Sequence, residues 1–306
     1  MHKIFIDGSA GTTGLRIRER LSDRKDLELM ILPDELRKDA AARAEMLNNS
    51  DISFLCLPDA AAIEAVSLIT NPDTVVIDTS TAHRTADNWT YGMPELTGLR
   101  EQIARSTRIA NPGCHASGFI ALVRPLVELG IIRKDEALSC FSLTGYSGGG
   151  KKMIAEYESA DRSPLLDAPR IYALGQAHKH LPEMVKLCGL TKEPVFSPIV
   201  ASFYSGMEVS VTLASDMISC SLDDIKTAYK DYYKSGLIRY DDSTEDGFIS
   251  AAAFSGRDDM IVSAFGSDER ITLISRFDNL GKGASGAAIQ NMNIRLGLDE
   301  AEGLVI

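Results

Sequence analysis

The sequence is poor in positive charge relative to negative charge. Its 306 residues include 32 lysines and arginines against 43 acidic residues, a formal net charge of −11 at pH 7. Proteins that bind the phosphate backbone of nucleic acid need a basic surface, so this balance disfavours a nucleic-acid partner. An anionic small-molecule substrate would therefore have to meet a local basic pocket.

Cysteine and long apolar segments are also scarce. The five cysteines are an odd number without any CxxC pair, which indicates free thiols in a reducing compartment and predicts no metal site. No apolar run reaches the roughly 18 residues that cross a bilayer. The N-terminus runs from a short strand into a glycine-rich turn rather than into a signal core. We therefore expect a cytoplasmic protein with no membrane partner.

The sequence does contain enough apolar residues, 44%, for a substantial core, and its length favours two domains. In the first 80 residues, strand-like runs alternate with segments of helical periodicity; the runs are 4–6, 27–32, 52–57 and 75–78. This alternation predicts a Rossmann-like α/β domain with a parallel, doubly wound sheet. Later β-rich runs at 138–145, 199–204 and 208–213 predict an α+β domain with a mixed or antiparallel sheet.

The change of pattern predicts a domain boundary at residue 114. The first domain then spans residues 1–114, and the second spans residues 115–283. Residues 284–306 begin in a glycine-rich turn and continue with helical periodicity, and we expect this late helix to return to the first domain.

The turn after the first strand carries glycines at a regular spacing of three. Gly8, Gly11 and Gly14 would let the backbone approach a pyrophosphate, whose charge the following helix N-terminus would meet; Ser9, Thr12 and Thr13 belong to the same turn. The spacing is GxxGxxG rather than GxGxxG, so a turn that only packs the helix against the strand remains an alternative. Its place after the first strand favours a dinucleotide.

Charges near the end of the second strand bear on the choice of dinucleotide. Arg37 and Lys38 could bind the 2′-phosphate of NADP, whereas Asp34 could bind the ribose of NAD. Solvated surface charges would look the same, so these residues favour NADP only slightly.

Cys114 is the predicted nucleophile. The segment Asn111-Pro112-Gly113-Cys114-His115 presents this thiol on a Pro-Gly turn, just before a helix expected to begin near Ala116. The helix dipole and free N–H groups lower the pKa of a thiol in that position. The other cysteines are expected to be structural, since two lie in apolar strands and two lack a comparable turn: Cys56, Cys140, Cys188 and Cys220.

Two neighbouring histidines offer the acid–base partner that a cysteine nucleophile needs. His180 is the first choice and His178 the second, because Glu183, three residues after His180, could orient its ring on a helix beginning near Pro182. A solvated or metal-binding surface pair of histidines is the structural alternative, the metal-binding version being disfavoured because no cysteine or further histidine lies nearby.

Two further segments could bind the substrate's anionic groups. Ser147, Gly148 and Lys151 belong to a glycine-rich loop after a predicted strand, where backbone N–H groups and a lysine could hold phosphate. Arg84 follows the strand at 75–78 and would suit a bidentate contact to carboxylate or phosphate. A flexible loop and a surface arginine are the alternatives.

These motifs together resemble a known family. Five segments, 8–14, 91–95, 111–118, 178–183 and 279–286, are similar to those of the N-acetyl-γ-glutamyl-phosphate reductases of arginine biosynthesis, in their shorter bacterial branch. The resemblance covers nearly the whole chain, and NPGC with HKHLPE is specific in combination. One departure concerns Arg84, because the longer branch carries an SADFR-like segment where this chain has Ser80-Thr81-Ala82-His83-Arg84.

The resemblance implies an NADP-dependent oxidoreductase with a Rossmann domain and a glyceraldehyde-3-phosphate-dehydrogenase-like catalytic domain, assembled as a homo-dimer or homo-tetramer. It implies that Cys114 forms a thioester, His180 is the acid–base and Glu183 supports it. The cofactor NADP(H) would contact the turn at 8–14 and the later loop, including Asn279, Gly281 and Gly283.

The expected reaction is the reduction of N-acetyl-L-glutamyl 5-phosphate to N-acetyl-L-glutamate 5-semialdehyde. Two alternatives stay open at the level of the sequence. An enzyme similar to aspartate-semialdehyde dehydrogenase would share the thioester route but bind a free α-amine. A non-catalytic NADP sensor would keep the glycine turn, but it would not need Cys114 on an activating turn.

Overall fold

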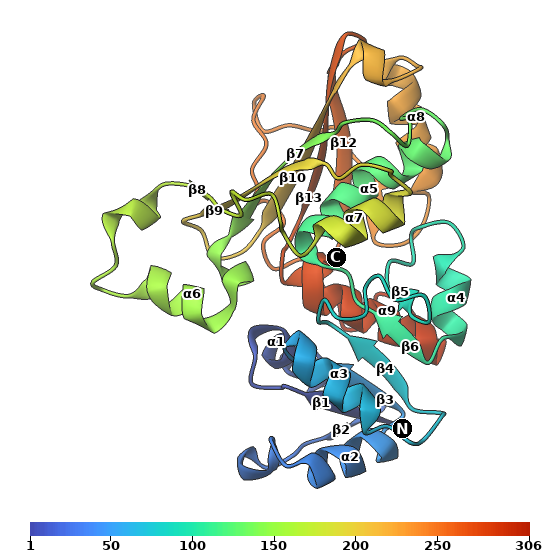
Figure 1. The fold of residues 1–306 in the computed structure, drawn as a ribbon, viewed down its shortest axis with the longest axis vertical. Coiled ribbons are helices and arrows are strands. Elements are labelled where there is room, and N and C mark those ends of the chain that lie inside the picture. The colour runs from blue at the N-terminus through green and yellow to red at the C-terminus, as the bar shows by residue number, and fades with distance from the viewer. The chain divides into compact units, whose positions relative to one another are not determined.

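The computed structural model describes residues 1–306, which form two compact units (Figure 1). One unit holds residues 1–112 and 284–305, and the other holds residues 113–283 with Ile306. Each unit is built on one β-sheet. No helix in the structure is both long and apolar enough to cross a lipid bilayer.

The first unit contains a six-stranded sheet in which every neighbouring pair is parallel, as the alternating sequence pattern predicts. In spatial order the strands are β2 (Leu27–Met30), β1 (His2–Asp7), β3 (Ile52–Leu55), β4 (Val75–Asp78), β6 (Arg108–Ala110) and β5 (Thr90–Tyr91). The helices are α1 (Thr12–Leu21), α2 (Ala40–Asn49), α3 (Asp59–Ser67), α4 (Leu99–Arg105) and α9 (Gly286–Leu296). The predicted doubly wound α/β sheet is confirmed.

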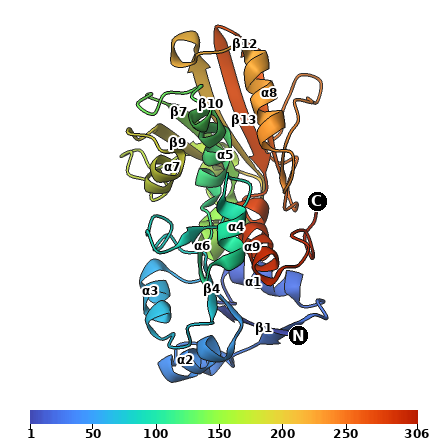
Figure 2. The ribbon, with the colours of Figure 1, turned by 90° about the vertical axis from the view of Figure 1, so that its right-hand side faces the viewer.

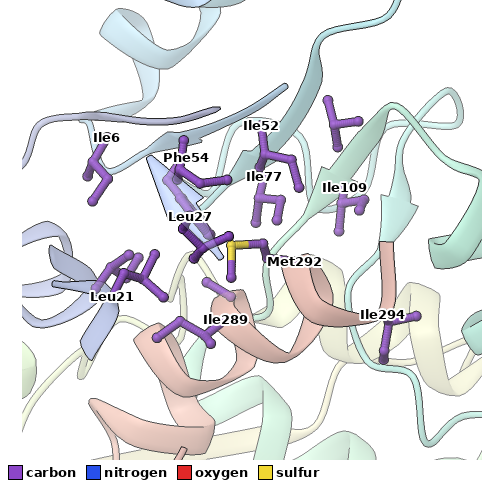
Figure 3. Packing of buried hydrophobic residues seen from close by; sticks show 14 of the residues in the cluster. Ile6, Leu21, Leu27, Ile52, Phe54, Ile77, Ile109, Ile289, Met292 and Ile294 are labelled. Atoms are coloured by element: carbon purple, nitrogen blue, oxygen red, sulfur yellow. The ribbon is translucent and has the colours of Figure 1, made fainter. Parts of the chain in front are cut away.

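The late helix α9 supplies part of this unit's core. Its Ile289 and Met292 are fully buried against Ile52, Phe54 and Ile77 of the central strands (Figure 3). Burial of these apolar side chains stabilises the unit by roughly 25 cal/mol for each Å² of apolar surface removed from water. The C-terminal segment is therefore an integral layer of the dinucleotide-binding type of fold rather than an appendage.

The second unit contains a mixed seven-stranded sheet. Its order is β11 (Ile238–Tyr240), β12 (Met260–Ser267), β13 (Arg270–Phe277), β10 (Met207–Ala214), β7 (Ser139–Gly145), β9 (Val195–Ala201) and β8 (Arg170–Ile171). The helices are α5 (Cys114–Glu128), α6 (Gly150–Glu158), α7 (Leu181–Cys188) and α8 (Leu222–Tyr232). The pairs β7–β9 and β11–β12 are parallel, and the other pairs are antiparallel.

Helices cover one face of this sheet. Helix α5 packs against β10 and β13, and α8 packs against β12 (Figure 2). Gly118 permits the close approach of α5, because a Cβ there would lie 2.4 Å from a methyl group of Val209. On the strands, residues of the opposite face include half-exposed apolar side chains, Phe141 at 50% and Val195 at 58%. The alternation of inward and outward residues along each strand explains this difference between the faces.

Candidate active site

The glycine turn at 8–14 is set by close packing. Gly8 has a φ of +86°, and a Cβ there would lie 2.3 Å from the carbonyl oxygen of Cys56. A Cβ on Gly14 would lie 2.5 Å from the carbonyl oxygen of Gly8. Gly11 caps α1 without a side-chain hydrogen bond, so the first N–H groups of the helix, beginning with Thr12 and Thr13, receive no side-chain cap. The turn therefore has the geometry that an anion-binding helix start requires.

A pocket lies at the carboxyl ends of β1 and β2, beside this turn. Its lining includes Gly8, Ser9 and two guanidinium groups, those of Arg18 and Arg37. The predicted Arg37 thus lines the pocket, where it also pairs with Asp34 at 3.0 Å, whereas the predicted Lys38 is exposed and does not line it. The sequence analysis missed Arg18, which lies on α1 four residues after Gly14 and one helical turn from the glycine turn. Glycines and two arginines form a cradle that fits a phosphate-bearing dinucleotide.

Cys114 is the first residue of α5. The preceding Gly113 is the N-cap, and its backbone N–H donates to Oε2 of Glu183 at 3.2 Å. The thiol is half-buried at a helix N-terminus, where the dipole favours a thiolate.

The other four thiols lie in different surroundings. Burial raises the pKa of Cys56 to about 12, and burial also raises the pKa of Cys140, Cys188 and Cys220 above the ordinary thiol value. A raised pKa leaves a thiol protonated and unreactive at neutral pH. Of the five cysteines, Cys114 alone begins a helix with an amide held by a buried carboxylate.

The glycine loop before α9 packs directly on Cys114. Residues Gly281–Ser285 form a π-helical turn, and a Cβ on Gly283 would lie 2.9 Å from Cβ of Cys114. A Cβ on Gly281 would lie 1.9 Å from the carbonyl oxygen of Arg257. Both predicted glycines are therefore fixed by close backbone contacts. They leave the loop no room for a larger residue beside Cys114.

Asn279 connects this loop to the glycine-rich loop at 146–150. Its Nδ2 donates to Oγ of Ser147 at 3.0 Å, and its Oδ1 accepts from the N–H of Gly206 at 2.9 Å. Ser147 is buried, Gly148 is exposed, and Lys151 lies exposed in the first turn of α6. The structure thus brings the predicted anion loop and the predicted cofactor residue Asn279 together.

The predicted acid–base residues form a compact cluster. His180 is 5% exposed and Glu183 is 1% exposed, and Nε2 of His180 lies 3.9 Å from Oε1 of Glu183. Because Oε2 of the same carboxylate binds Gly113, Glu183 contacts both the histidine segment and the turn that carries Cys114. Helix α7 begins at Leu181, which places the two side chains one helical turn apart.

His178 differs from His180 in its surroundings. Its Nδ1 accepts a hydrogen bond from the backbone N–H of His180 at 3.2 Å, and the two rings lie 4.7 Å apart. Burial, with a further contribution from Lys179, lowers the pKa of His178 to about 4. A neutral ring whose Nδ1 is already an acceptor cannot take up a proton without losing that bond. This geometry favours His180 over His178 as the group that gains a proton.

Two residues of the cluster were missed by the sequence analysis. His115 follows Cys114, and its ring nitrogens contact Oγ of Ser142 at 2.6 Å and the hydroxyl of Tyr172 at 2.7 Å. Burial, then the charges of His178 and Lys179, lower the pKa of His115 to about 3. Burial and the charge of Cys114 raise the pKa of Tyr172. His115 was visible in the NPGCH motif, but Tyr172 has no motif of its own.

Arg84 contacts backbone in this structure. Its guanidinium donates to the carbonyl oxygens of Asn111 and Thr79, each at 3.0 Å, at the ends of β6 and β4. Beside it, Nδ1 of His83 lies 2.6 Å from the buried carboxylate of Asp78. Arg84 therefore braces the segment that leads to Pro112 and Gly113. The substrate contact expected of it stays a prediction.

Two protein families match this chain, one over its first part and one over its second part. The family described as semialdehyde dehydrogenase, NAD binding domain, matches residues 3–106, and the family described as semialdehyde dehydrogenase, dimerisation domain, matches residues 114–279. N-acetyl-gamma-glutamyl-phosphate reductase 2 of Nostoc sp. is 44% identical, with 99% of each chain covered. The chain belongs to the N-acetyl-γ-glutamyl-phosphate reductase family. A second relative of this name, from Brucella suis, is 43% identical over 96% of this chain and 99% of its own.

Solved structures of aspartate semialdehyde dehydrogenases have a similar fold. Aspartate semialdehyde dehydrogenase II from Vibrio cholerae matches with a TM-score of 0.74 at 15% identity, over 97% of this chain and 98% of that one. The Candida albicans aspartate semialdehyde dehydrogenase, solved with NADP, matches with a TM-score of 0.70 at 16% identity, over 96% and 98%. These likenesses concern the fold, and they confirm the predicted fold class. The family makes the chain an oxidoreductase, which disfavours the non-catalytic sensor.

Proposed function

We propose that the protein reduces N-acetyl-L-glutamyl 5-phosphate to N-acetyl-L-glutamate 5-semialdehyde in arginine biosynthesis, with NADPH and a thioester on Cys114. The observation that carries this proposal is the site of Cys114, which begins α5 one residue after an amide held by the buried Glu183. The names of relatives at 43–44% identity over nearly the full length support the substrate.

The residues that would hold NADPH are those around the glycine turn. The N–H groups at the start of α1 would face its pyrophosphate, and Arg37 with Arg18 would bind the 2′-phosphate. When bound, the dinucleotide supplies the hydride that reduces the thioester. Lys38, Asn279, Gly281 and Gly283 remain proposed cofactor residues, the last two as the tight loop beside Cys114.

Cys114 carries the covalent chemistry. Its thiolate attacks the acyl carbon, the carbon–sulfur bond forms, and the bond to the phosphate oxygen breaks, which leaves a thioester and inorganic phosphate. After reduction the tetrahedral oxyanion collapses, the carbon–sulfur bond breaks, and the free aldehyde leaves Cys114 as a thiolate again. The N–H groups at the start of α5, where the N-cap Gly113 supplies no side-chain cap, would stabilise the developing oxyanion.

His180 handles the proton. It accepts the proton of the Cys114 thiol and passes it to the departing phosphate. After the aldehyde has left, one proton from solvent restores the Cys114 thiol for the next cycle. Glu183, 3.9 Å from Nε2 of His180, stabilises the imidazolium form. His178, neutral and bonded to the His180 backbone, fixes the segment and presents its other ring nitrogen as a donor.

Binding of the substrate's anionic groups is assigned to two segments. Ser147, Gly148 and Lys151, at the 3₁₀ turn Tyr146–Gly149 and the start of α6, would hold the phosphate through a hydroxyl, backbone N–H groups and one ammonium. Arg84 would contribute a carboxylate contact only by exchanging its backbone partners for substrate.

We further propose that the protein acts as a homo-dimer through the sheet face that carries Phe141 and Val195, with a homo-tetramer as the larger alternative. The match to a dimerisation domain and the half-exposed apolar side chains on that face support this assembly. The five thiols, none in a disulfide, support the cytoplasm as its location.

One assay tests the proposed function. NADPH formation is followed in the reverse direction with N-acetyl-L-glutamate semialdehyde and with aspartate semialdehyde, each with inorganic phosphate and NADP⁺. We expect kcat/KM to be higher for the acetylated substrate by at least about 100-fold, since a site built for an amide rejects a free ammonium. Equal or greater activity with aspartate semialdehyde would assign the enzyme to the other substrate.

A further inference from the structure

A chain of three hydrogen-bonding side chains runs beside the nucleophile and takes no part in the mechanism described so far. Ser142, on β7, is fully buried and contacts Nδ1 of His115 at 2.6 Å. His115, 3% exposed, is the second residue of α5 and contacts the Tyr172 hydroxyl through Nε2 at 2.7 Å. Its ring also lies against the rings of His178 and His180, with 5.5 and 5.6 Å between ring centroids.

The direction of these hydrogen bonds follows from the burial of Ser142. A neutral imidazole has one donor and one acceptor nitrogen, so only two arrangements are available. If Tyr172 donated to Nε2, Nδ1 would donate to Ser142, and the Ser142 hydroxyl hydrogen would be buried without an acceptor, because its one hydrogen bond is to His115. A buried donor without an acceptor is costly, which favours the opposite direction.

In the favoured arrangement Ser142 donates to Nδ1, and Nε2–H of His115 donates to the oxygen of Tyr172. The phenolic hydrogen of Tyr172 is then available to a ligand, since its hydroxyl contacts His115 alone. His115 is the residue next to Cys114 in α5, so its hydrogen bond holds the Tyr172 hydroxyl beside the start of this helix. Burial and the charge of Cys114 both raise the pKa of Tyr172. A hydroxyl whose oxygen already accepts a hydrogen bond is a better donor, because successive hydrogen bonds polarise one another.

The segment that carries Tyr172 is held rigidly. The N–H of Tyr172 donates to Pro198 at 3.0 Å, and the Gln176 amide group makes two hydrogen bonds to the backbone of Phe196, at 2.8 and 2.9 Å. Ala173 and Gln176 have φ values of +50° and +54°, in the left-handed backbone region that residues other than glycine rarely adopt. Surrounding contacts must impose this backbone, and they hold the segment that carries Tyr172 in place.

We propose that Tyr172 donates a hydrogen bond to the acyl oxygen of the substrate bound at Cys114, and that His115 and Ser142 are positioning residues that fix the direction of this donor. The proposal rests on the thioester reaction proposed above. Tyr172 transfers no proton; it adds a side-chain donor to the N–H groups of α5 that face the oxyanion.

Double-mutant cycles test this relation. The variants are Tyr172→Phe, His115→Phe and their combination, with Tyr232→Phe, whose hydroxyl contacts Glu128, as the matched control. We expect Tyr172→Phe to lower kcat about 100-fold, as loss of one oxyanion donor does, with KM for NADP⁺ changed less than twofold. Because His115 acts through Tyr172, the double variant should be no slower than Tyr172→Phe alone.

Ser142→Ala provides a second cycle if His115→Phe does not fold. We expect it to lower kcat by itself and to have no further effect in the Tyr172→Phe background. Losses that multiply in both cycles, or full kcat in Tyr172→Phe, would overturn the proposal. Wild-type protein without activity on N-acetylglutamate semialdehyde would instead overturn the proposed function, and this inference with it, so the two failures are told apart by the wild-type rate.

Discussion

Replacing Gly283 by alanine should displace Cys114 without removing any charged or hydrogen-bonding group. The new Cβ would lie 2.9 Å from Cβ of Cys114 and 3.1 Å from the carbonyl oxygen of Asp278. Carbon atoms in ordinary contact are about 3.5–4.0 Å apart, so a shift of about 0.5–1 Å is needed. The Asp278 carbonyl is fixed by the N–H groups of Gly281 and Gly283, so the shift falls mainly on Cys114.

The expected magnitude follows from this displacement. A misplacement of about 1 Å at a reacting centre costs about 100-fold in rate, so we expect kcat to fall between about 10- and 100-fold. Overpacking should also lower the free energy of unfolding by about 1–3 kcal/mol. Gly175→Ala is the control, because Gly175 is exposed and a Cβ there meets no atom within 4 Å.

The assay combines steady-state rates with alkylation of Cys114. kcat is measured with N-acetylglutamate semialdehyde, phosphate and NADP⁺ for wild type and both glycine variants, and urea unfolding separates lost stability from lost activity. Gly283→Ala protein with wild-type kcat and wild-type alkylation rate would refute the argument that this loop sets the position of the nucleophile.

Three further predictions concern the neighbouring groups. Glu183→Gln keeps an acceptor for the Gly113 N–H but removes the charge 3.9 Å from His180, so kcat should fall about tenfold with stability nearly unchanged, and an unaltered kcat would remove Glu183 from the mechanism. The pKa of His115 is about 3 when folded and 6.5 in the unfolded chain, so its contribution to stability is present above pH 6.5 and is lost as the pH falls. From pH 7 to pH 5 the free energy of unfolding should therefore fall by about 2 kcal/mol on account of His115. Urea unfolding of His115→Phe should lack this fall, and an identical fall in the variant would contradict the view that His115 is buried in its neutral form. Arg37→Ala should raise KM for NADPH about 10- to 100-fold but leave KM for NADH nearly unchanged, and Lys38→Ala should raise KM for NADPH less, because Lys38 does not line the pocket; equal effects of the two variants would place the 2′-phosphate elsewhere.

The parallel sheet of the first unit could be predicted because its pattern is local. Apolar runs of strand length alternate with helical periodicity, and the turn at Gly8 is marked by its glycines. Boundaries were less accurate where a turn depends on long-range contacts. The strand expected at 199–204 is β9, Val195–Ala201, because the chain turns after Ala201 and the carbonyl groups of Phe203 and Tyr204 accept hydrogen bonds from the N–H groups of Tyr146 and Ser147. Helix α5 begins at Cys114 rather than near Ala116.

The candidate site was only partly visible in the sequence, for a physical reason. Cys114, His180 and Glu183 belong to short motifs whose spacing reflects a helix start. Their proposed roles could therefore be inferred from the neighbouring residues in the sequence. Tyr172 joins the cluster because its segment has a left-handed backbone at two residues and is held by hydrogen bonds between Gln176 and the backbone of Phe196, which no local pattern indicates. Arg18 reaches the pocket only because α1 lies against the end of β2. Contacts between distant segments, rather than motifs, decide these positions.

The central claim is that Cys114 forms the thioester, and a substitution of its sulfur tests this most directly. Cys114→Ser is assayed for NADP⁺ reduction with N-acetylglutamate semialdehyde and phosphate. In a second experiment each protein is mixed with the acyl phosphate in the absence of NADPH and then denatured, and mass spectrometry detects the adduct. We expect wild-type protein to gain one N-acetylglutamyl group on Cys114, and the variant to show no adduct and to lose at least about 1000-fold in kcat. Near wild-type turnover by Cys114→Ser would contradict the mechanism.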